Sequence, residues 1–507
     1  MELEGPGSMR TEFDRKYANS TLIYMAAMVV IVLYVEGMLT PSLPAIAREF
    51  GVTSAQVSLV LALYLVSGTA MAPVLGKLGD IYGKKRILTY VLIVYSIAVT
   101  TTGFSPTFEF MLASRMVQGC GLGVMPLAMT LIREEFPRDL IPRSQAIISA
   151  MFGVGAAVSI PIGAYVSNSY GWQFTYHTAI PFVVLITIVV IYRLRESRYT
   201  RQSKIDYAGA AALAASLGMV VLGLSLAPSR GWTDMLVLLL LVVGLLAIVP
   251  LAIYERRSRE PILNLRLLRQ RNVLIPNLVV LANGLGMFLA MQTVAFRFES
   301  PPPSGYGYNI FDTGLSIVPF AGAQLVFAPI AGFVVTRTGV KPISVIGAAM
   351  SAASFLFAAM TTTANQLYVA EFFAGGGLSF LNASVINLLI LTVETRELAL
   401  VTSMNTVFRT LGSSMGAPIA GTILASYTID ISVDGSPTLQ FPSHAAYDYC
   451  FLIAAAVFAA VILILPFALE VLGKRTKAKL VPDTFQTKLE VNGSAKEART
   501  KLGLEDS

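Results

Sequence analysis

The sequence predicts an all-α polytopic membrane protein, with two six-helix pseudo-symmetric bundles and two further helices inserted between them. Three observations lead to this prediction: long apolar runs, a one-sided distribution of cations, and a repeat that relates the two halves of the chain. Of the 507 residues, 55% are hydrophobic and only 13% are charged, and the mean hydropathy is +0.68. Soluble domains carry about 25% charged residues, so we expect most of this surface to face lipid.

Each apolar run that is long enough to cross a bilayer, about 20 residues as a helix, is a predicted membrane span. The runs are continuous rather than alternating, which favours helices over a β-barrel. Fourteen spans are predicted, at residues 21–43, 57–76, 87–104, 108–132, 145–167, 175–193, 206–226, 235–254, 274–296, 312–335, 342–360, 366–391, 399–427 and 447–472.

The cations indicate how these spans are oriented. With the amino terminus placed inside, thirty-two of the 37 Lys and Arg residues fall in inner segments, and only Arg48, Arg230 and Arg297 fall outside. We therefore expect a multi-pass protein of the plasma membrane with both termini in the cytoplasm. The polar tail at 473–507 is predicted to be disordered, with a lipid-binding or regulatory tail as the alternative.

The residue types also disfavour several classes of protein. Cys120 and Cys450 lie inside apolar runs, and His177 and His444 are the only histidines, so we expect neither a disulfide framework nor a metal site. The formal net charge of +7 is accounted for by loops beside the membrane, which argues against a nucleic acid partner. No phosphate-binding glycine loop or nucleophile–base pair is present, so we expect no enzyme, no catalytic residue and no ATP drive.

A repeat at an offset of 256 positions divides the chain into halves. The loop Gly76-Lys-Leu-Gly-Asp-Ile-Tyr-Gly-Lys-Lys-Arg86 is partly repeated as Gly332-Phe-Val-Val-Thr-Arg-Thr-Gly-Val-Lys-Pro342. The predicted parts are a cytoplasmic segment at 1–20 (1–8 resembling an expression scar), a bundle at 21–194, a linker with the inserted pair at 195–272, a second bundle at 273–472, and the tail. Two such related halves are typical of transporters.

The loop at 76–86 resembles the loop between the second and third helices of the major facilitator superfamily. The arrangement of six, two and six spans resembles the fourteen-spanner drug:proton antiporter branch of that superfamily. Three further stretches carry the resemblance: Leu112-Ala-Ser-Arg-Met-Val-Gln-Gly119, Gly171-Trp-Gln-Phe174 and Asp206-Tyr-Ala-Gly209. The resemblance implies the major-facilitator fold, a monomer in contact with membrane lipids, and proton-coupled export of hydrophobic or cationic small molecules by alternating access.

Three departures from the family pattern are present, and the one in the fifth helix keeps uptake open. Glu36 precedes Pro44 by eight residues, whereas the branch usually has an Asp nine residues before its Leu-Pro. Ile81 stands where the loop usually has Arg, and the fifth helix reads Gly153-Val-Gly155 and then Ile160-Pro161-Ile-Gly163, without the usual Gly before Pro. One alternative is a proton-coupled symporter that takes up an organic solute, and another is a non-transporting membrane sensor. The proton is the predicted coupling ion, and no cofactor is expected.

Charged residues inside the predicted spans are the candidates for proton coupling or substrate binding, because a charge there is costly and rarely faces lipid. The repeat pairs Glu36 with Gln292 and Arg115 with Glu371. A carboxyl in low dielectric favours its protonated form, which makes Glu36 a proton carrier or a contact for a cationic substrate. The alternatives are a purely structural hydrogen bond for Glu36, Arg115 or Gln292, and snorkelling to the outer interface for Glu371.

Two further groups of residues are assigned to movement. The predicted gate is the basic loop with its carboxylate, and its residues are Gly76, Asp80, Gly83, Lys84, Lys85 and Arg86. Close helix packing and kinks are predicted at Gly155, Pro161, Gly163, Gly412 and Pro418. The alternative for the loop is a topological anchor, and for the glycines and prolines it is ordinary tight packing.

Overall fold

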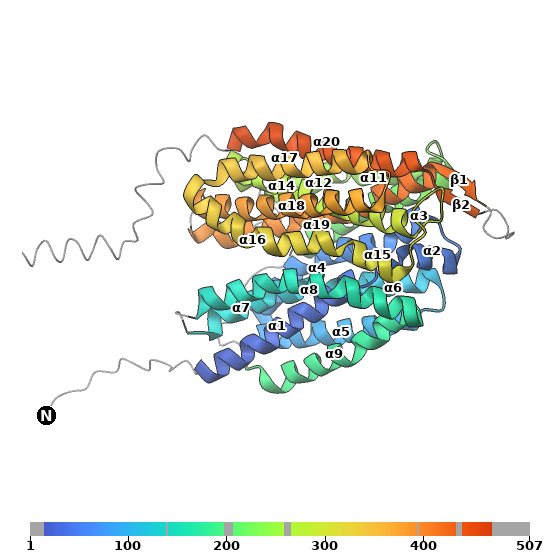
Figure 1. Ribbon diagram of the computed structural model, residues 1–507. Coiled ribbons are helices and arrows are strands. Elements are labelled where there is room, and N and C mark those ends of the chain that lie inside the picture. The colour runs from blue at the N-terminus through green and yellow to red at the C-terminus, as the bar shows by residue number, and fades with distance from the viewer. Residues whose placement is uncertain are drawn as a thin grey trace, which may run out of the picture.

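The computed structural model describes residues 15–137, 140–196, 206–257, 265–392, 395–431 and 439–468. The predicted tail at 473–507 lies outside these residues. Figure 1 shows the helices gathered into two bundles that lie side by side, with the blue-to-green first half in one and the yellow-to-red second half in the other. The predicted all-α membrane architecture is confirmed.

The first bundle is built from the first part of the chain. Its elements are α1 (Arg15–Gly37), η1 (Thr40–Ser42), α2 (Leu43–Phe50), α3 (Ser54–Val57), α4 (Leu59–Tyr82), α5 (Lys84–Gly103), α6 (Phe108–Gln118), η2 (Gly119–Gly123), α7 (Val124–Glu135), α8 (Ile141–Tyr170) and α9 (Trp172–Arg193). The inserted pair follows as α10 (Tyr207–Arg230), α11 (Met235–Leu246) and α12 (Ile248–Arg257), with the short α13 (Leu265–Leu268) after it.

The second bundle repeats the plan of the first. Its elements are α14 (Arg271–Glu299), α15 (Ile310–Ser316), α16 (Val318–Thr338), α17 (Val340–Ala359), α18 (Ala364–Thr392), α19 (Thr395–Ser426), β1 (Thr428–Ile431), β2 (Leu439–Pro442) and α20 (His444–Ala468). The antiparallel β1–β2 hairpin, in which Ile429 pairs with Phe441, was not predicted.

Eleven helical segments within the described residues are long and apolar enough to cross a membrane. Three further long helices, α8, α18 and α19, have 30, 29 and 32 residues and lie at the remaining predicted positions. The total of fourteen spans stays a prediction.

Four predicted spans are interrupted where the sequence lacks backbone donors or side chains. The first helix ends at Gly37 instead of 43, because Pro41 and Pro44 follow and have no N–H to donate. The fourth contains a 3₁₀ segment, η2, in which three of five residues are glycine. The eighth divides into α11 and α12 at Ala247, since Pro250 cannot donate to the carbonyl of Leu246. The tenth divides into α15 and α16 at Ile317, since Pro319 cannot donate to the carbonyl of Leu315.

The backbone confirms the repeat at the turn that follows α4. Gly83 has φ 103° and its counterpart Gly339 has φ 89°, a conformation that favours glycine. Each glycine ends one helix and begins the next, α5 in the first bundle and α17 in the second. Two turns of this kind at one offset indicate that both halves share a backbone plan.

The two ends of the molecule differ, and we name them by their contents. The hairpin end holds α2, α3 and the β1–β2 hairpin, which lie together at the right of Figure 1. The loop end holds residues 76–86, because α4 runs for 24 residues away from α3, about 36 Å at 1.5 Å per residue. One apolar core, to which both bundles contribute, runs between these ends.

Candidate functional site

Arg115 is held by an extensive set of contacts inside the first bundle. It has no exposed surface, its Nε donates to the carbonyl of Val60 at 2.9 Å, and its Nη1 donates to Gln118 Oε1 at 3.0 Å. Its guanidinium carbon lies 4.8 Å from the centre of the Tyr64 ring, within range of a cation–π interaction. Gln118 extends the network by donating to the carbonyl of Ala98 at 3.1 Å.

The Arg115 network connects three helices. Val60 and Tyr64 belong to α4, Ala98 to α5, and Arg115 and Gln118 to α6. One nitrogen of Arg115, Nη2, is buried and has no hydrogen-bond partner among the described residues. Nη2 and its two N–H groups are therefore available to a further partner, such as a substrate or a rearranged side chain.

Glu36 lies where the two bundles face each other. It is the last residue but one of α1, is partly buried, and interacts electrostatically with Arg409 of α19 and with Arg115 of α6. Arg409 comes from the second bundle and Arg115 from the first, so this carboxyl interacts with cations of both halves. The expected pairing of Glu36 with Arg115 is an interaction at a distance, because the guanidinium donates to Val60 and Gln118.

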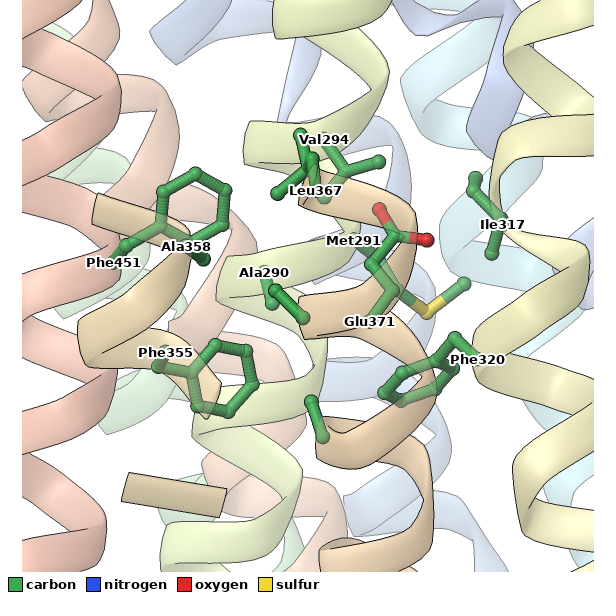
Figure 2. Close-up of a pocket in the computed structure, with 12 residues that line it drawn as sticks. Ala290, Met291, Val294, Ile317, Phe320, Phe355, Ala358, Leu367, Glu371 and Phe451 are labelled. Atoms are coloured by element: carbon green, nitrogen blue, oxygen red, sulfur yellow. The ribbon is translucent and has the colours of Figure 1, made fainter. Parts of the chain in front are cut away.

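Glu371 has a very different environment in the second bundle. It is 6% exposed, and neither of its carboxylate oxygens has a hydrogen-bond partner among the described residues. It lines a cavity of about 20 Å³ between α14, α17, α18 and α20 and the α15–α16 junction. Figure 2 shows the carboxylate beside Met291, Ile317 and Phe320. The side chain therefore does not extend to the protein surface, as snorkelling to the outer interface would require.

Gln292 joins the two bundles at the hairpin end. Its side chain has no exposed surface, and its Nε2 donates to the carbonyl of Ser54 in α3 at 3.2 Å. Ser54 in turn donates through its hydroxyl to the carbonyl of Gly421 in α19 at 3.1 Å. The counterpart of Glu36 is therefore placed in a contact between halves.

An ion pair also joins the two bundles at the hairpin end, and it was not predicted. Arg48 of α2 pairs with Glu299 at the end of α14, and their side chains are 47% and 4% exposed. Arg297, two residues earlier, is fully buried and donates to the carbonyls of Ala358 and Thr361. The sequence suggested only that Arg48 and Arg297 lie outside, because a partner 251 positions away leaves no local signal.

The predicted gate is an ionic cluster within the first bundle. Lys84 is 2% exposed, and its Nζ lies 3.0 Å from Asp80 Oδ1 and 2.8 Å from Glu134 Oε1. The carboxylate of Glu196 accepts from the backbone N–H groups of Lys85 at 2.9 Å and Arg86 at 3.0 Å, which caps the start of α5. Glu134 and Glu196 are the partners that sequence reasoning missed.

The glycines and prolines lie at matching helix contacts in the two bundles. A Cβ at Gly155 would lie 2.6 Å from Leu33 Cβ, and one at Gly412 would meet the backbone of Leu281. The helices α8 and α1, and α19 and α14, therefore approach closely at equivalent points. Gly163 likewise lies against the backbone of Met38. Pro161 and Pro418 lie inside α8 and α19.

Gly76 differs from the other glycines of the gate. A Cβ added at Gly76 would meet nothing within 4 Å, so no close packing requires glycine there in this arrangement. Gly83, in contrast, has both a positive φ and the Glu196 carboxylate beside it.

Comparison with known proteins places this geometry in a family. The chain is 25% identical over 400 residues to the multidrug transporter protein MdtP of Bacillus subtilis, covering 78% of this chain and 73% of the relative. It is 23% identical over 421 residues to the tetracenomycin C resistance and export protein of Streptomyces glaucescens, covering 82% and 77%. The multidrug resistance protein 3 of Bacillus subtilis is 25% identical over 373 residues, covering 72% and 71%.

Solved structures agree on the fold. The nucleoside transporter NupG matches with a TM-score of 0.62 at 12% identity, covering 89% of this chain and 100% of that one. The human organic anion transporter MFSD10 matches with a TM-score of 0.56 at 15% identity, covering 88% and 99%. The profile of the Major Facilitator Superfamily matches residues 25–323 and 278–490. The chain therefore belongs to the Major Facilitator Superfamily, as the resemblance of its loop at 76–86 implied, and it is a transporter rather than an enzyme.

Proposed function

We propose that this protein is a proton-coupled secondary transporter that exports hydrophobic or cationic small molecules by alternating access. The observation that carries the proposal is the position of Glu36, a titratable carboxyl that interacts with Arg115 of its own half and Arg409 of the other. A proton on this carboxyl removes its charge and with it the attraction to both cations. Proton binding therefore changes the energy of the contact between the bundles.

The second support is the closure of the hairpin end. Contacts between the halves there include the Arg48–Glu299 pair and the hydrogen bonds of Gln292 and Ser54. In alternating access, such contacts must break when this end opens, while the opposite end closes. On the predicted topology, the hairpin end faces outward and the structure is closed to the outside.

The third support is the direction suggested by relatives. Proteins similar over most of this chain are named for multidrug transport or for resistance and export. Export against a gradient needs an energy source, which the transmembrane proton gradient would provide through binding and release of a proton at Glu36. A proton from outside displaces the substrate, and its release inside restores the carboxylate.

Transport by purified protein in liposomes tests the proposal. We expect a proton gradient to drive flux of the cation tetraphenylphosphonium, and Glu36→Gln to abolish the gradient-driven component. Glu109→Gln, an exposed glutamate at the start of α6, is the matched control and should transport normally. Gradient-driven flux that survives in Glu36→Gln would remove Glu36 from the mechanism, and flux in the direction of the proton would favour the symporter.

A further inference from the structure

We propose that the Glu371 cavity binds the positively charged group of an apolar amine or phosphonium, and that the ligand enters from the bilayer past Ile317. The proposal rests on the proposed transport function, because it names the substrate class and its place of binding. It differs from the proton site at Glu36, since it lies wholly within the second bundle.

The first step is the unsatisfied carboxylate. Both oxygens of Glu371 are buried, and neither accepts a hydrogen bond from the described residues. Arg297 does not pair with it: Nη1 and Nη2 of Arg297 donate to the carbonyls of Ala358 and Thr361, and Nη1 lies 3.8 Å from Asp448 Oδ1. Ionising a carboxyl that is buried in the membrane without a partner is costly, and such residues usually mark a functional site. A bound cation would supply the missing partner.

The lining of the cavity defines the class of ligand. Glu371 is the one polar residue among the described residues that line it, and the others are Ala, Met, Val, Ile, Leu and Phe. Phe320, Phe355 and Phe451 offer aromatic faces that attract a cation, and Met291 adapts its shape readily. A sugar, an acid or a peptide would bury polar groups here without partners. The site therefore suits a single positive charge with apolar substituents.

The size of the cavity requires movement. A volume of about 20 Å³ holds roughly one water molecule. A ligand enters only if one wall moves, and the wall at Ile317 is the one built to do so. Ile317 is the junction of α15 and α16. The helical hydrogen bond from residue 319 to the carbonyl of Leu315 is missing there, because Pro319 has no N–H.

A second cavity lies on the other side of Ile317. Its volume is about 130 Å³, and Ile160 and Pro161 of α8 line it together with Ile317 and residues of α16. Every residue that lines it is apolar or glycine, and Ile317 lines both cavities. Val318 and Leu325 are 40% and 45% exposed, so the cavity meets the lipid side of the seam between α8 and α16. We name it the seam cavity.

The two cavities together define a route. An apolar cation dissolved in the bilayer reaches the seam cavity through lipid-facing α16, and displacement of Ile317 then opens the way to Glu371. Along this route the positive charge of the ligand stays in an apolar environment until it reaches the carboxylate of Glu371. The seam between the bundles also widens or narrows as they rock, which couples access to the transport cycle.

Equilibrium binding of radiolabelled tetraphenylphosphonium to the full-length protein in detergent tests the site. We expect Glu371→Gln to weaken binding about tenfold or more, equivalent to about 1.4 kcal/mol, and Glu371→Asp to retain part of the affinity. Glu109→Gln is the control and should bind normally. Unchanged affinity in Glu371→Gln would overturn the proposal.

Binding kinetics test the route. A Cβ at Gly322 meets nothing within 4 Å and Gly322 lines the seam cavity, so Gly322→Leu places a larger side chain in that cavity. We expect association and dissociation to slow together by about fivefold, with the equilibrium constant unchanged. Gly218→Leu, at an equally open glycine of α10, is the matched control. Unaltered rates in Gly322→Leu would exclude entry through the seam.

These results separate the inference from the proposed function. Binding in detergent needs no proton gradient, so a cation that binds at Glu371 without gradient-driven transport would contradict the function and leave the site. Gradient-driven transport of tetraphenylphosphonium with full affinity in Glu371→Gln would contradict the site and leave the function.

Discussion

The two bundles place opposite charges at equivalent positions and treat them in opposite ways. Arg115 of the first bundle donates to Val60 and Gln118 and lies over Tyr64, whereas Glu371 of the second has no hydrogen-bond partner among the described residues. The hydrogen bonds of Arg115 and Gln118 tie three helices together, whereas a buried carboxyl without a hydrogen-bond partner is available to a ligand. The repeat therefore gave the halves a common backbone and different tasks.

The residues that follow the glycine turns after α4 and α16 also differ in charge. Lys84 is buried between Asp80 and Glu134, and the residue at its offset of 256 is Val340, which is equally buried among apolar neighbours. The first bundle therefore buries a lysine between two carboxylates at a position where the second bundle buries a valine.

The largest expected effect is on Arg115. Arg115→Ala leaves Gln118, Tyr64 and the carbonyl of Val60 without their partner, and we expect the free energy of unfolding in detergent to fall by about 3 kcal/mol. Thermal unfolding followed by fluorescence measures the change. A loss no greater than that of the control Arg230→Ala, at the surface end of α10, would mean that Arg115 does not hold the bundle together.

The next effect concerns the ionic loop. Lys84→Val copies the second bundle into the first and leaves Asp80 and Glu134 facing each other. We expect a loss of about 2 kcal/mol in the same assay. Lys85→Val should cost less, because the carboxylate of Glu196 contacts the backbone of Lys85 rather than its side chain. Equal losses would show that the cluster around Lys84 has no special part in stability.

Substitution of Glu371 should raise the free energy of unfolding, whereas the substitutions of Arg115 and Lys84 should lower it. Glu371→Leu replaces an unpaired buried carboxylate with an apolar side chain in an apolar cavity. We expect a gain of about 1 kcal/mol in unfolding free energy together with loss of cation binding. A destabilised Glu371→Leu protein would indicate that the carboxylate has a structural partner, and the contrast between the bundles would then fail.

The smallest expected effect is on the equilibrium between the closed and open forms of the hairpin end. Glu299→Gln weakens the pair with Arg48, and because Arg48 is half exposed we expect a shift of only about 1 kcal/mol toward opening of the hairpin end. Spin labels on cysteines at Glu109 and Asp430, exposed positions of the two halves, report the distance. A longer distance should gain population in the variant. An unchanged distribution would show that this pair does not hold the end closed.

Much of this fold could be predicted from the sequence, because membrane spans and the repeat are written in local patterns. The offset of 256 led directly to Arg115 opposite Glu371 and to the matching turns at Gly83 and Gly339. The interruption at Ile317 follows from Pro319, yet apolar periodicity alone concealed it. The β1–β2 hairpin was missed, since it forms from a short connection between two predicted spans.

The partners of the candidate residues were harder to predict. The interaction of Glu36 with Arg409 joins positions in different halves, and so does that of Arg48 with Glu299. Such contacts depend on how the two bundles pack, for which no single stretch of sequence holds a signal. The same holds for the isolation of Glu371, which is a property of all the apolar side chains around it.

A measurement of proton release during substrate binding tests whether cation binding is coupled to deprotonation of Glu36. Purified protein in weakly buffered detergent receives tetraphenylphosphonium, and a pH-sensitive dye records protons. We expect the wild-type protein to release protons, Glu36→Gln to release markedly fewer, and Glu371→Gln to need a higher cation concentration for the same release. Proton uptake on binding, or full release in Glu36→Gln, would contradict the coupling of cation binding to proton release from Glu36.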